Sequence, residues 1–280
     1  MLKNTDEIRP SAIAGTWYSD DAKKLQDEIS TYIMQAKIPP LHGRVIGLIS
    51  PHAGYRYSGP TAGYAYRAVL EKQFDIVAIF SPFHAYTPVK LLTSAHAYYQ
   101  TPLGLVPVAQ DLVNGFQEKI ALQGLNVEFI SYDEEHSLEI QLPFLQTALK
   151  GSFELFPLMV RTHDMDEIET IAQAAADITN GKNVLWVAST DLSHFYNQKT
   201  AAMLDDEMLR RISTFSPQLV LDAEKESRAF ACGAGAVAVV LSITRKLGAT
   251  TVQILHYSTS AEGTGDTSSV VGYGAATIES

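Results

Sequence analysis

The sequence predicts an α/β fold in which helices cover both faces of a largely parallel central sheet. Five short apolar runs, at 44–50, 75–81, 153–160, 183–189 and 251–257, have the unbroken hydrophobicity of strands buried on both faces. Segments with helical periodicity separate these runs, and such alternation is typical of parallel sheets. Since composition shows no break, repeat or low-complexity linker, we expect one three-layer α/β/α domain over residues 1–280.

Weaker patterns extend this scheme. Three further strand candidates are at 89–93, 125–131 and 269–278. Residues 20–36 have apolar positions at helical spacing, and either Ser19 or Asp20 is expected to cap that helix. Pro60 is expected in the first turn of a helix over 59–72, and Pro143 is expected to kink a helix over 137–149. The remaining predicted helices are 164–179, 198–213 and 233–248.

Composition limits the function classes. The chain has 280 residues, a formal net charge of −10 and a pI near 5.2, which argues against nucleic acid or anionic membranes as main partners. Its one cysteine, Cys232, excludes an intrachain disulfide. The N-terminal stretch lacks the apolar core of a signal peptide, and no apolar run is long enough to span a bilayer. We therefore expect a cytoplasmic protein with a reduced thiol.

Polar side chains collect directly after four of the predicted strands. They are His52, His84, the pair Glu135 and His136, and the pair Asp191 and His194. Ligands of open α/β sheets bind beyond the carboxyl ends of the strands. If these strands are parallel neighbours, the four clusters converge on one rim of the sheet.

Two histidines in matching positions favour a metal site. Imidazole suits iron, copper, zinc or nickel, and two histidines with one anionic ligand leave open positions on the metal. The residues alone leave the third ligand open among Asp191, Glu135 and Cys232. Cys232 precedes the predicted helix 233–248, and a helix N-terminus favours the metal-binding thiolate.

Each candidate also has a structural interpretation. Cys232 is compatible with a small core residue, Asp191 with a helix cap, and His136 with Glu135 and Glu139 as a surface cap. Trp17 and Tyr57 are aromatic side chains that either pack or line a pocket. No functional context surrounds His42, His96, His163 or His256. The absence of GxSxG, HExxH and CxxC disfavours an α/β-hydrolase, a zincin and a structural zinc site, and the glycine-rich stretch 261–274 lacks a Walker lysine.

Seven ordered motifs resemble the Memo family, also called the AmmeMemoRadiSam system protein B family. They are "IRPSAIAGTWYSDD", "SPHAGYRYSGPTA", "SPFHAYTP", "YYQTPLG", "DEEHSLEIQLPFLQ", "STDLSHF" and "ACGAGAV". The resemblance extends from Arg9 to about Gly274. It implies a fold similar to class III extradiol dioxygenases, which hold non-haem iron with two histidines and a glutamate. Memo proteins have two histidines and a cysteine at the matching pocket.

The resemblance also implies roles for individual residues. It assigns the metal ligands to His52, His84 and Cys232, and a catalytic-base position to His194 with Asp191 beside it. It places Trp17 and Tyr57 in the pocket lining, where we also count Glu135 and His136 as candidates. The implied cofactor is iron or copper, with zinc as a possibility, because a thiolate is a softer ligand than a carboxylate. The system name implies radical-SAM and AMMECR1-like proteins as partners.

Three functions remain open, in this order. The first is a metal-dependent redox or metal-handling activity of the oxidoreductase class. The second is a non-catalytic module that has a dioxygenase fold without dioxygenase activity and binds a small molecule, a peptide or a partner protein. The third is a hydrolase that acts through a metal-bound water with His194 as base.

Overall fold

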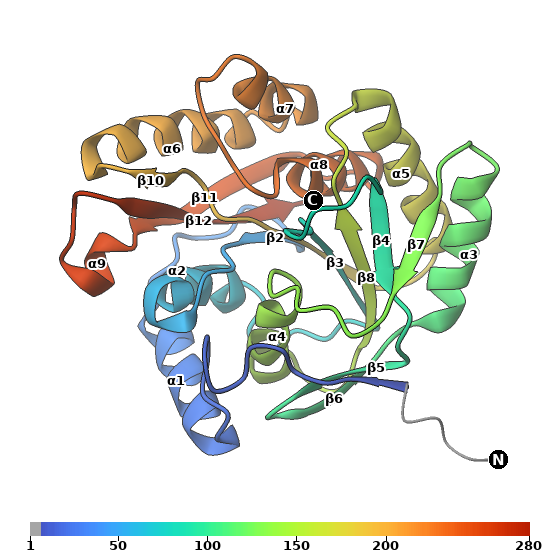
Figure 1. Ribbon diagram of the computed structural model, residues 1–280, viewed down its shortest axis with the longest axis horizontal. Helices are drawn as coiled ribbons and strands as arrows, with labels where there is room; N and C mark the ends of the chain where they lie inside the picture. The colour runs from blue at the N-terminus through green and yellow to red at the C-terminus, as the bar shows by residue number, and fades with distance from the viewer. Residues whose placement is uncertain (1–6) are drawn as a thin grey trace.

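A computed structural model describes residues 7–280 of the chain, in which a nine-stranded sheet lies between two layers of helices (Figure 1). The first six residues of the predicted domain lie outside this range. The strand order is β10-β12-β2-β9-β3-β8-β4-β7, and β11 pairs with β12. The strands are β2 (Val45–Ser50), β3 (Ile76–Ser81), β4 (Leu91–Ser94), β7 (Val127–Ile130), β8 (Glu154–Val160), β9 (Val184–Ser189), β10 (His194–Tyr196), β11 (Thr251–Thr259) and β12 (Val270–Glu279).

The centre of this sheet is parallel, as the continuous apolar runs predict. β2, β9, β3 and β8 pair side by side in one direction, and all of β2, β3 and β9 is buried. The flanks are antiparallel: β12 opposes both β2 and β11, and β4 opposes β8. The predicted buried strand at 251–257 is therefore a half-exposed antiparallel strand. Only residues 260–269 join β11 to β12, which is too short for a crossover to a parallel strand.

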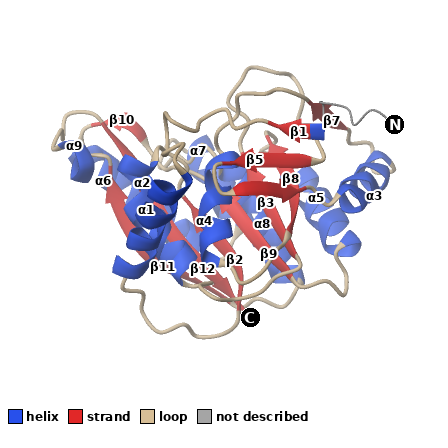
Figure 2. Cartoon of the chain, turned by 90° about the horizontal axis from the view of Figure 1, so that it is seen from below, coloured by secondary structure: helices blue, strands red, loops and turns tan. Residues whose placement is uncertain are grey.

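Helices cover both faces of the sheet (Figures 1 and 2). On one face lie α1 (Ala22–Gln35), α2 (Tyr55–Arg67) and α4 (Leu142–Ala148). On the other lie α5 (Met165–Ile178), α6 (Gln198–Ser213), α7 (Pro217–Lys225) and α8 (Ala234–Lys246), with α3 (Gln110–Ala121) packed against α5. A short helix, α9 (Ala261–Thr264), lies between β11 and β12, and a 3-10 helix (Glu139–Gln141) precedes α4.

Three details of the predicted helices are wrong. Asp21, not Ser19 or Asp20, caps α1, because its side chain accepts from the backbone N–H of Lys24. Pro60 lies inside α2, which begins five residues earlier, at Tyr55. Pro143 marks the start of α4, where a missing backbone N–H costs nothing, and does not kink a longer helix.

Several elements were missed by the sequence analysis. A small second sheet contains β1 (Ile8–Arg9), β5 (Tyr98–Thr101) and β6 (Gly104–Pro107), and neither α3 nor α7 was predicted. The strands of the small sheet have two to four residues each, too few to show a period. None of the helices in residues 7–280 is long and apolar enough to cross a membrane.

Candidate metal centre

Three imidazoles meet at one rim of the central sheet. His52 follows β2 and His84 follows β3, and β9 lies between these two strands. His136 joins them from the segment between β7 and α4. Their candidate ligand nitrogens all lie within 4.8 Å of one another, and the three ring-centroid distances are 5.3, 5.5 and 4.6 Å. Three residues spread over more than eighty positions of the chain, from His52 to His136, therefore converge on a common point.

His136 was expected to follow the end of a parallel strand at 125–131, and the structure positions it differently. β7 runs parallel to β4, β4 runs antiparallel to β8, and β8 runs parallel to β3. β7 thus points the opposite way to β3, and its carboxyl end is not at the rim where His84 lies. The irregular segment 131–138, and not a strand end, carries Glu135 and His136 to the site.

Hydrogen bonds fix the tautomer of His52. The hydroxyl of Ser189 donates its single proton to the carbonyl of Ser137 at 2.6 Å and accepts from Nε2 of Gln141 at 2.8 Å. Nδ1 of His52, 3.0 Å from the same hydroxyl oxygen, must therefore be the donor of that contact. Burial lowers the pKa of His52 well below its usual value. The ring is neutral, and its Nε2 offers a lone pair.

Cys232 lies against that lone pair. Its Sγ is 3.1 Å from Nε2 of His52, and the backbone N–H of Asp191 donates to Sγ at 3.2 Å. Burial and the charge of Asp191 raise the pKa of the thiol, so Cys232 is protonated and donates to His52. The sequence analysis expected a helix N-terminus to favour the thiolate. Cys232 precedes the cap residue Gly233, and burial acts against the thiolate and favours the protonated thiol.

A glycine makes this approach possible. A Cβ atom at Gly233 would lie 2.4 Å from the carbonyl oxygen of Ser189, so only glycine lets the start of α8 pass so close to the end of β9. A Cβ at Gly235 would similarly lie 2.5 Å from the carbonyl of Thr162. Glycine at these two positions therefore lets the first turn of α8 pack closely on its neighbours.

Glu135 orients His84. One carboxylate oxygen accepts from Nδ1 of His84 at 2.9 Å and the other from its backbone N–H at 2.6 Å. Burial opposes the charge of Glu135, but these hydrogen bonds outweigh burial and hold its pKa well below the usual range. Burial also lowers the pKa of His84, and Glu135 reverses that effect and raises it. Nε2 of His84 is left facing the other imidazoles, in the carboxylate–histidine pattern of metal sites.

Aromatic stacking holds His136. Its ring centroid lies 4.1 Å from that of Trp17 and 4.6 Å from that of His84. Burial lowers the pKa of His136 to about 4, against the charge of Glu135, so this ring is also neutral near pH 7. A neutral imidazole is the form that binds a metal.

Asp191 and His194 lie beside the cluster. The buried carboxylate of Asp191 accepts from the backbone N–H of His52 at 2.7 Å, and burial raises the pKa of Asp191 to about 7. His194 opens β10, is half-buried, and has a pKa lowered by burial. Within residues 7–280 no hydrogen bond joins Asp191 to His194, so Asp191 supports the backbone of His52 in this arrangement.

A cavity of about 400 Å³ adjoins the imidazoles. Its lining contains Trp17, which stacks on His136, and Ala53, the neighbour of His52. Tyr57 also lines it, together with Thr16, Gly54, Ser260, Thr264, Val271 and Tyr273. No charged side chain contributes to this lining. The two aromatic residues that the resemblance assigned to a pocket thus border one cavity.

A buried ion-pair network supports the site and was missed by the sequence analysis. Arg9 is 1% exposed and forms ion pairs with Asp133 and Glu139. Arg9 also donates to the carbonyl of Glu135 at 2.8 Å. Glu139 accepts from the hydroxyl of Tyr18 at 2.8 Å as well. The position of Glu139 within the apolar run 137–149 was the available signal, because a buried charge requires a partner.

Three of the four histidines without a predicted role have structural contacts. His96 is buried and accepts from the backbone N–H of Tyr132 at 3.2 Å. His163 pairs with Glu224 at 3.4 Å. His256 stacks on Tyr64 with ring centroids 4.0 Å apart.

Comparisons with known proteins agree with these motifs. A family model described as "Memo-like protein" matches residues 9–277. A MEMO1 family protein of Nitrosopumilus maritimus is 36% identical, over 96% of this chain and 98% of that protein. MEMO1 family proteins of Methanosarcina barkeri and Thermotoga neapolitana are 32% and 33% identical, over 97% and 95% of this chain and 100% and 98% of their own lengths.

Proposed function

The chain belongs to the Memo family, and on this premise we propose that it binds a transition metal through His52, His84 and Cys232 and performs redox or metal-handling chemistry. The observation that carries this proposal is the convergence of the imidazole nitrogens within 4.8 Å, with the Cys232 thiol 3.1 Å from His52. His136 supplies a further nitrogen within reach of the same point.

The donor atoms fit a metal ion. Ser189 and Glu135 bind Nδ1 of His52 and of His84, which leaves Nε2 of each ring as the atom available to a metal. Such supporting partners are characteristic of histidine ligands. The Cys232 thiol must lose its proton to bind a metal, so metal binding would release a proton into solution. Nitrogen and sulfur donors suit iron, copper and zinc, and we propose iron or copper as the functional metal.

The chain's own residues supply the rest of the chemistry. When bound, the metal would offer open coordination positions for a substrate or for dioxygen. His194 is neutral and half-buried, and we assign it the role of taking a proton from a substrate in the adjoining cavity. A positioned base contributes roughly 10²–10⁴-fold to a rate. Trp17 covers one face of His136 and limits the access of water to it.

Metal analysis after anaerobic purification tests the proposal. We expect stoichiometric iron or copper in the wild-type protein and its loss in His52→Ala. His163→Ala is the matched control, because that imidazole pairs with Glu224 outside the cluster. A wild-type protein that retains no metal under several loading conditions would refute the proposal.

The cavity beside the imidazoles favours a second candidate function. Trp17 and Tyr57 line a neutral space of about 400 Å³, which is the size of a small-molecule site. A binding module would recognise a small molecule or a peptide there, and radical-SAM and AMMECR1-like proteins are candidate partners. Co-purification with these partners that survives the double substitution His52→Ala/His84→Ala would favour this function over metal chemistry.

A further inference from the structure

Strand β11 forms an open edge of the central sheet. It pairs with β12 along its length, and among residues 7–280 no other strand pairs with it. No hydrogen bond outside the β11–β12 ladder reaches the backbone of residues 251–258 within this range. An antiparallel strand directs alternate N–H and C=O groups outward. The outer side of β11 therefore presents a row of available backbone donors and acceptors.

Apart from the β-bulge between Ile254 and His256, this edge lacks the usual features that prevent pairing. Edge strands of monomers commonly carry charged residues or proline, or are very short. The nine residues of β11, "TVQILHYST", include no lysine, arginine, acid or proline. β11 does carry a register shift between Ile254 and His256, which turns both Ile254 and Tyr257 toward α6. A long, uncharged edge is the kind to which another strand adds.

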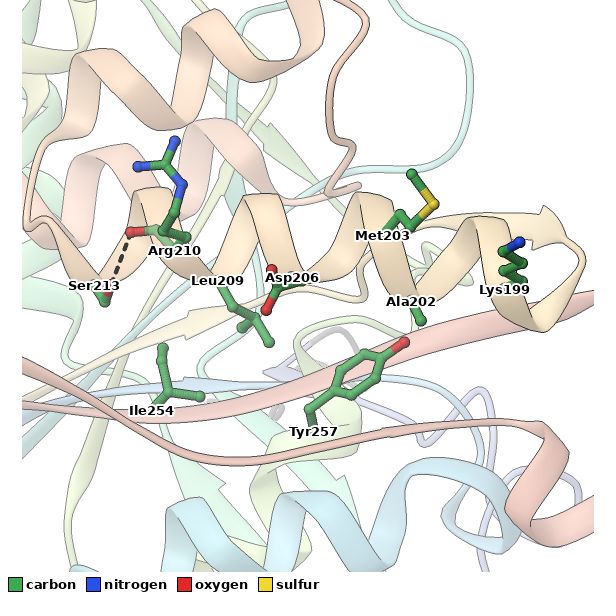
Figure 3. Close-up of a pocket in the computed structure, with 9 residues that line it drawn as sticks. All are labelled: Lys199, Ala202, Met203, Asp206, Leu209, Arg210, Ser213, Ile254 and Tyr257. Carbon is green, nitrogen blue, oxygen red and sulfur yellow. Dashed lines mark hydrogen bonds between the residues drawn. The ribbon is translucent and has the colours of Figure 1, made fainter.

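A groove runs between this edge and α6 (Figure 3). Its α6 side is a stripe at helical spacing that contains Lys199, Ala202, Met203, Asp206, Leu209, Arg210 and Ser213. In Figure 3, Leu209 and Ala202 point from the helix toward Ile254 and Tyr257 of β11. Met203 is 68% exposed on the outer side of the helix. The groove is thus apolar on its floor and charged along its helical rim.

We propose that this edge and groove are the interface of a homodimer in which β11 pairs antiparallel with β11 of a second copy. A two-fold axis perpendicular to the sheet would join the two nine-stranded sheets into one. The side chain of Ile254 from each copy would then enter the groove of the other. None of the residues in this interface belongs to the candidate metal centre, so the proposal is independent of the proposed function.

The position of α6 agrees with this arrangement. α6 packs over both β11 and β12, and neighbouring strands are about 4.8 Å apart. In a β11–β11 pair the two-fold axis lies midway between the two copies of β11, which is half a strand spacing outside β11. A helix centred between β11 and β12 is half a spacing inside β11, so it lies about 4.8 Å from that axis. The two copies of α6 would then be about 10 Å apart, at the upper end of the range for packed helices. Edge pairing would therefore bring the two copies of α6 to packing distance.

The charges of the stripe are complementary to themselves. Asp206 lies between Lys199 and Arg210 along α6. Two antiparallel copies of α6 can therefore bring Asp206 of one beside Lys199 or Arg210 of the other, although Arg210 also pairs with Glu207 of its own helix at 2.8 Å. A stripe of a single sign would repel its own copy.

Sedimentation velocity of the full chain, from micromolar to near-millimolar concentration, tests the interface. We expect a reversible species of twice the chain mass of 30.6 kDa. Asp206→Lys makes the stripe wholly basic and should raise the dimer dissociation constant at least about tenfold. Glu118→Lys, the same charge change on the exposed side of α3, should leave the dimer intact.

Mixing two variants separates lost pairing from lost folding. Lys199→Asp/Arg210→Asp makes the stripe wholly acidic and should also be monomeric. A one-to-one mixture with Asp206→Lys should form a heterodimer, and amide exchange in residues 251–259 should slow as it forms. A wild-type chain that stays monomeric throughout, or a dimer that Asp206→Lys leaves unchanged, would overturn the proposal and assign the groove to a different partner.

Discussion

Nε2 of His52 lies 3.1 Å from Sγ of Cys232, although the two residues are 180 positions apart. The loop after β2 carries the imidazole, and the approach to α8 carries the thiol. The contact depends on Ser189, which accepts the Nδ1 proton and leaves Nε2 as the acceptor of the S–H group. A neutral histidine and a protonated thiol are thus held so close together that a metal ion could take the place of the thiol proton between them.

Cys232→Ser should weaken metal binding and change its spectrum. Serine keeps a hydroxyl near His52 but is a much weaker ligand than a thiolate. We expect an affinity loss of about 100-fold and loss of the sulfur-to-metal charge-transfer band in the cobalt(II)-substituted protein. Competition with a chromophoric chelator measures the affinity. Because Cys232 is the only cysteine, a charge-transfer band that persists in this variant could not arise from a thiolate and would contradict Cys232 as a ligand.

Glu135→Gln should weaken the same site through His84. The carboxylate accepts from both Nδ1 and the backbone N–H of His84, and an amide would replace one acceptor with a donor. Loss of such a supporting partner typically costs 10–100-fold in metal affinity, and we expect that range here. Glu134→Gln, an exposed neighbour on the same segment, is the matched control. Equal affinity for the two variants would show that Glu135 does not orient a ligand.

His52 and His84 could be placed together from sequence, because β2 and β3 are buried on both faces and form continuous apolar runs that mark where each strand ends. The same reasoning placed His136 near them for the wrong reason. It assumed that 125–131 was one more parallel strand, whereas β7 runs the other way. Strand direction depends on pairing between distant segments, and local periodicity contains no information about it.

Supporting residues were harder to predict than candidate ligands. Histidines stand out by type, but nothing local marks Ser189 as the partner of His52. The helix-start argument for Cys232 also left out burial, which favours the protonated thiol. Burial of a single side chain follows from the whole packing arrangement, and it often outweighs a local electrostatic effect on a pKa.

Arg9→Ala should strongly destabilise the fold. Arg9 is 1% exposed, and its removal would leave the carboxylates of Asp133 and Glu139 buried without their cation. Breaking a buried ion pair from one side typically costs 3–5 kcal/mol, and we expect about that loss in the free energy of unfolding. Urea denaturation followed by circular dichroism measures it.

Arg228→Ala is the control for this change. The Arg228 side chain is 70% exposed, and its ion pair with Glu226 is long, at 4.0 Å, and solvated. This substitution should leave the urea midpoint unchanged. Arg9→Lys should recover only part of the stability, since lysine cannot contact Asp133 and Glu139 with the same planar group. A midpoint for Arg9→Ala equal to that of Arg228→Ala would show that the buried network does not stabilise the fold.

Asp205→Asn should flatten the dependence of stability on pH. Asp205 is fully buried, and burial raises its pKa, although its carboxylate accepts from the backbone N–H of Ser193 and the hydroxyl of Tyr257. Between the unfolded pKa, about 4, and the raised folded value, the native state binds more protons than the unfolded state, so stability falls as pH rises through this window. Asparagine carries no charge and keeps an acceptor for Ser193.

The measurement is urea unfolding of both proteins at a series of pH values. As pH rises through the window, the wild type should lose stability relative to Asp205→Asn. Above the window the difference in unfolding free energy between the two proteins should become constant. Asp27→Asn, an exposed change on α1, should show no such trend. A wild-type stability that rises with pH relative to Asp205→Asn would mean that the carboxylate is stabilised in the fold, contrary to the effect of burial.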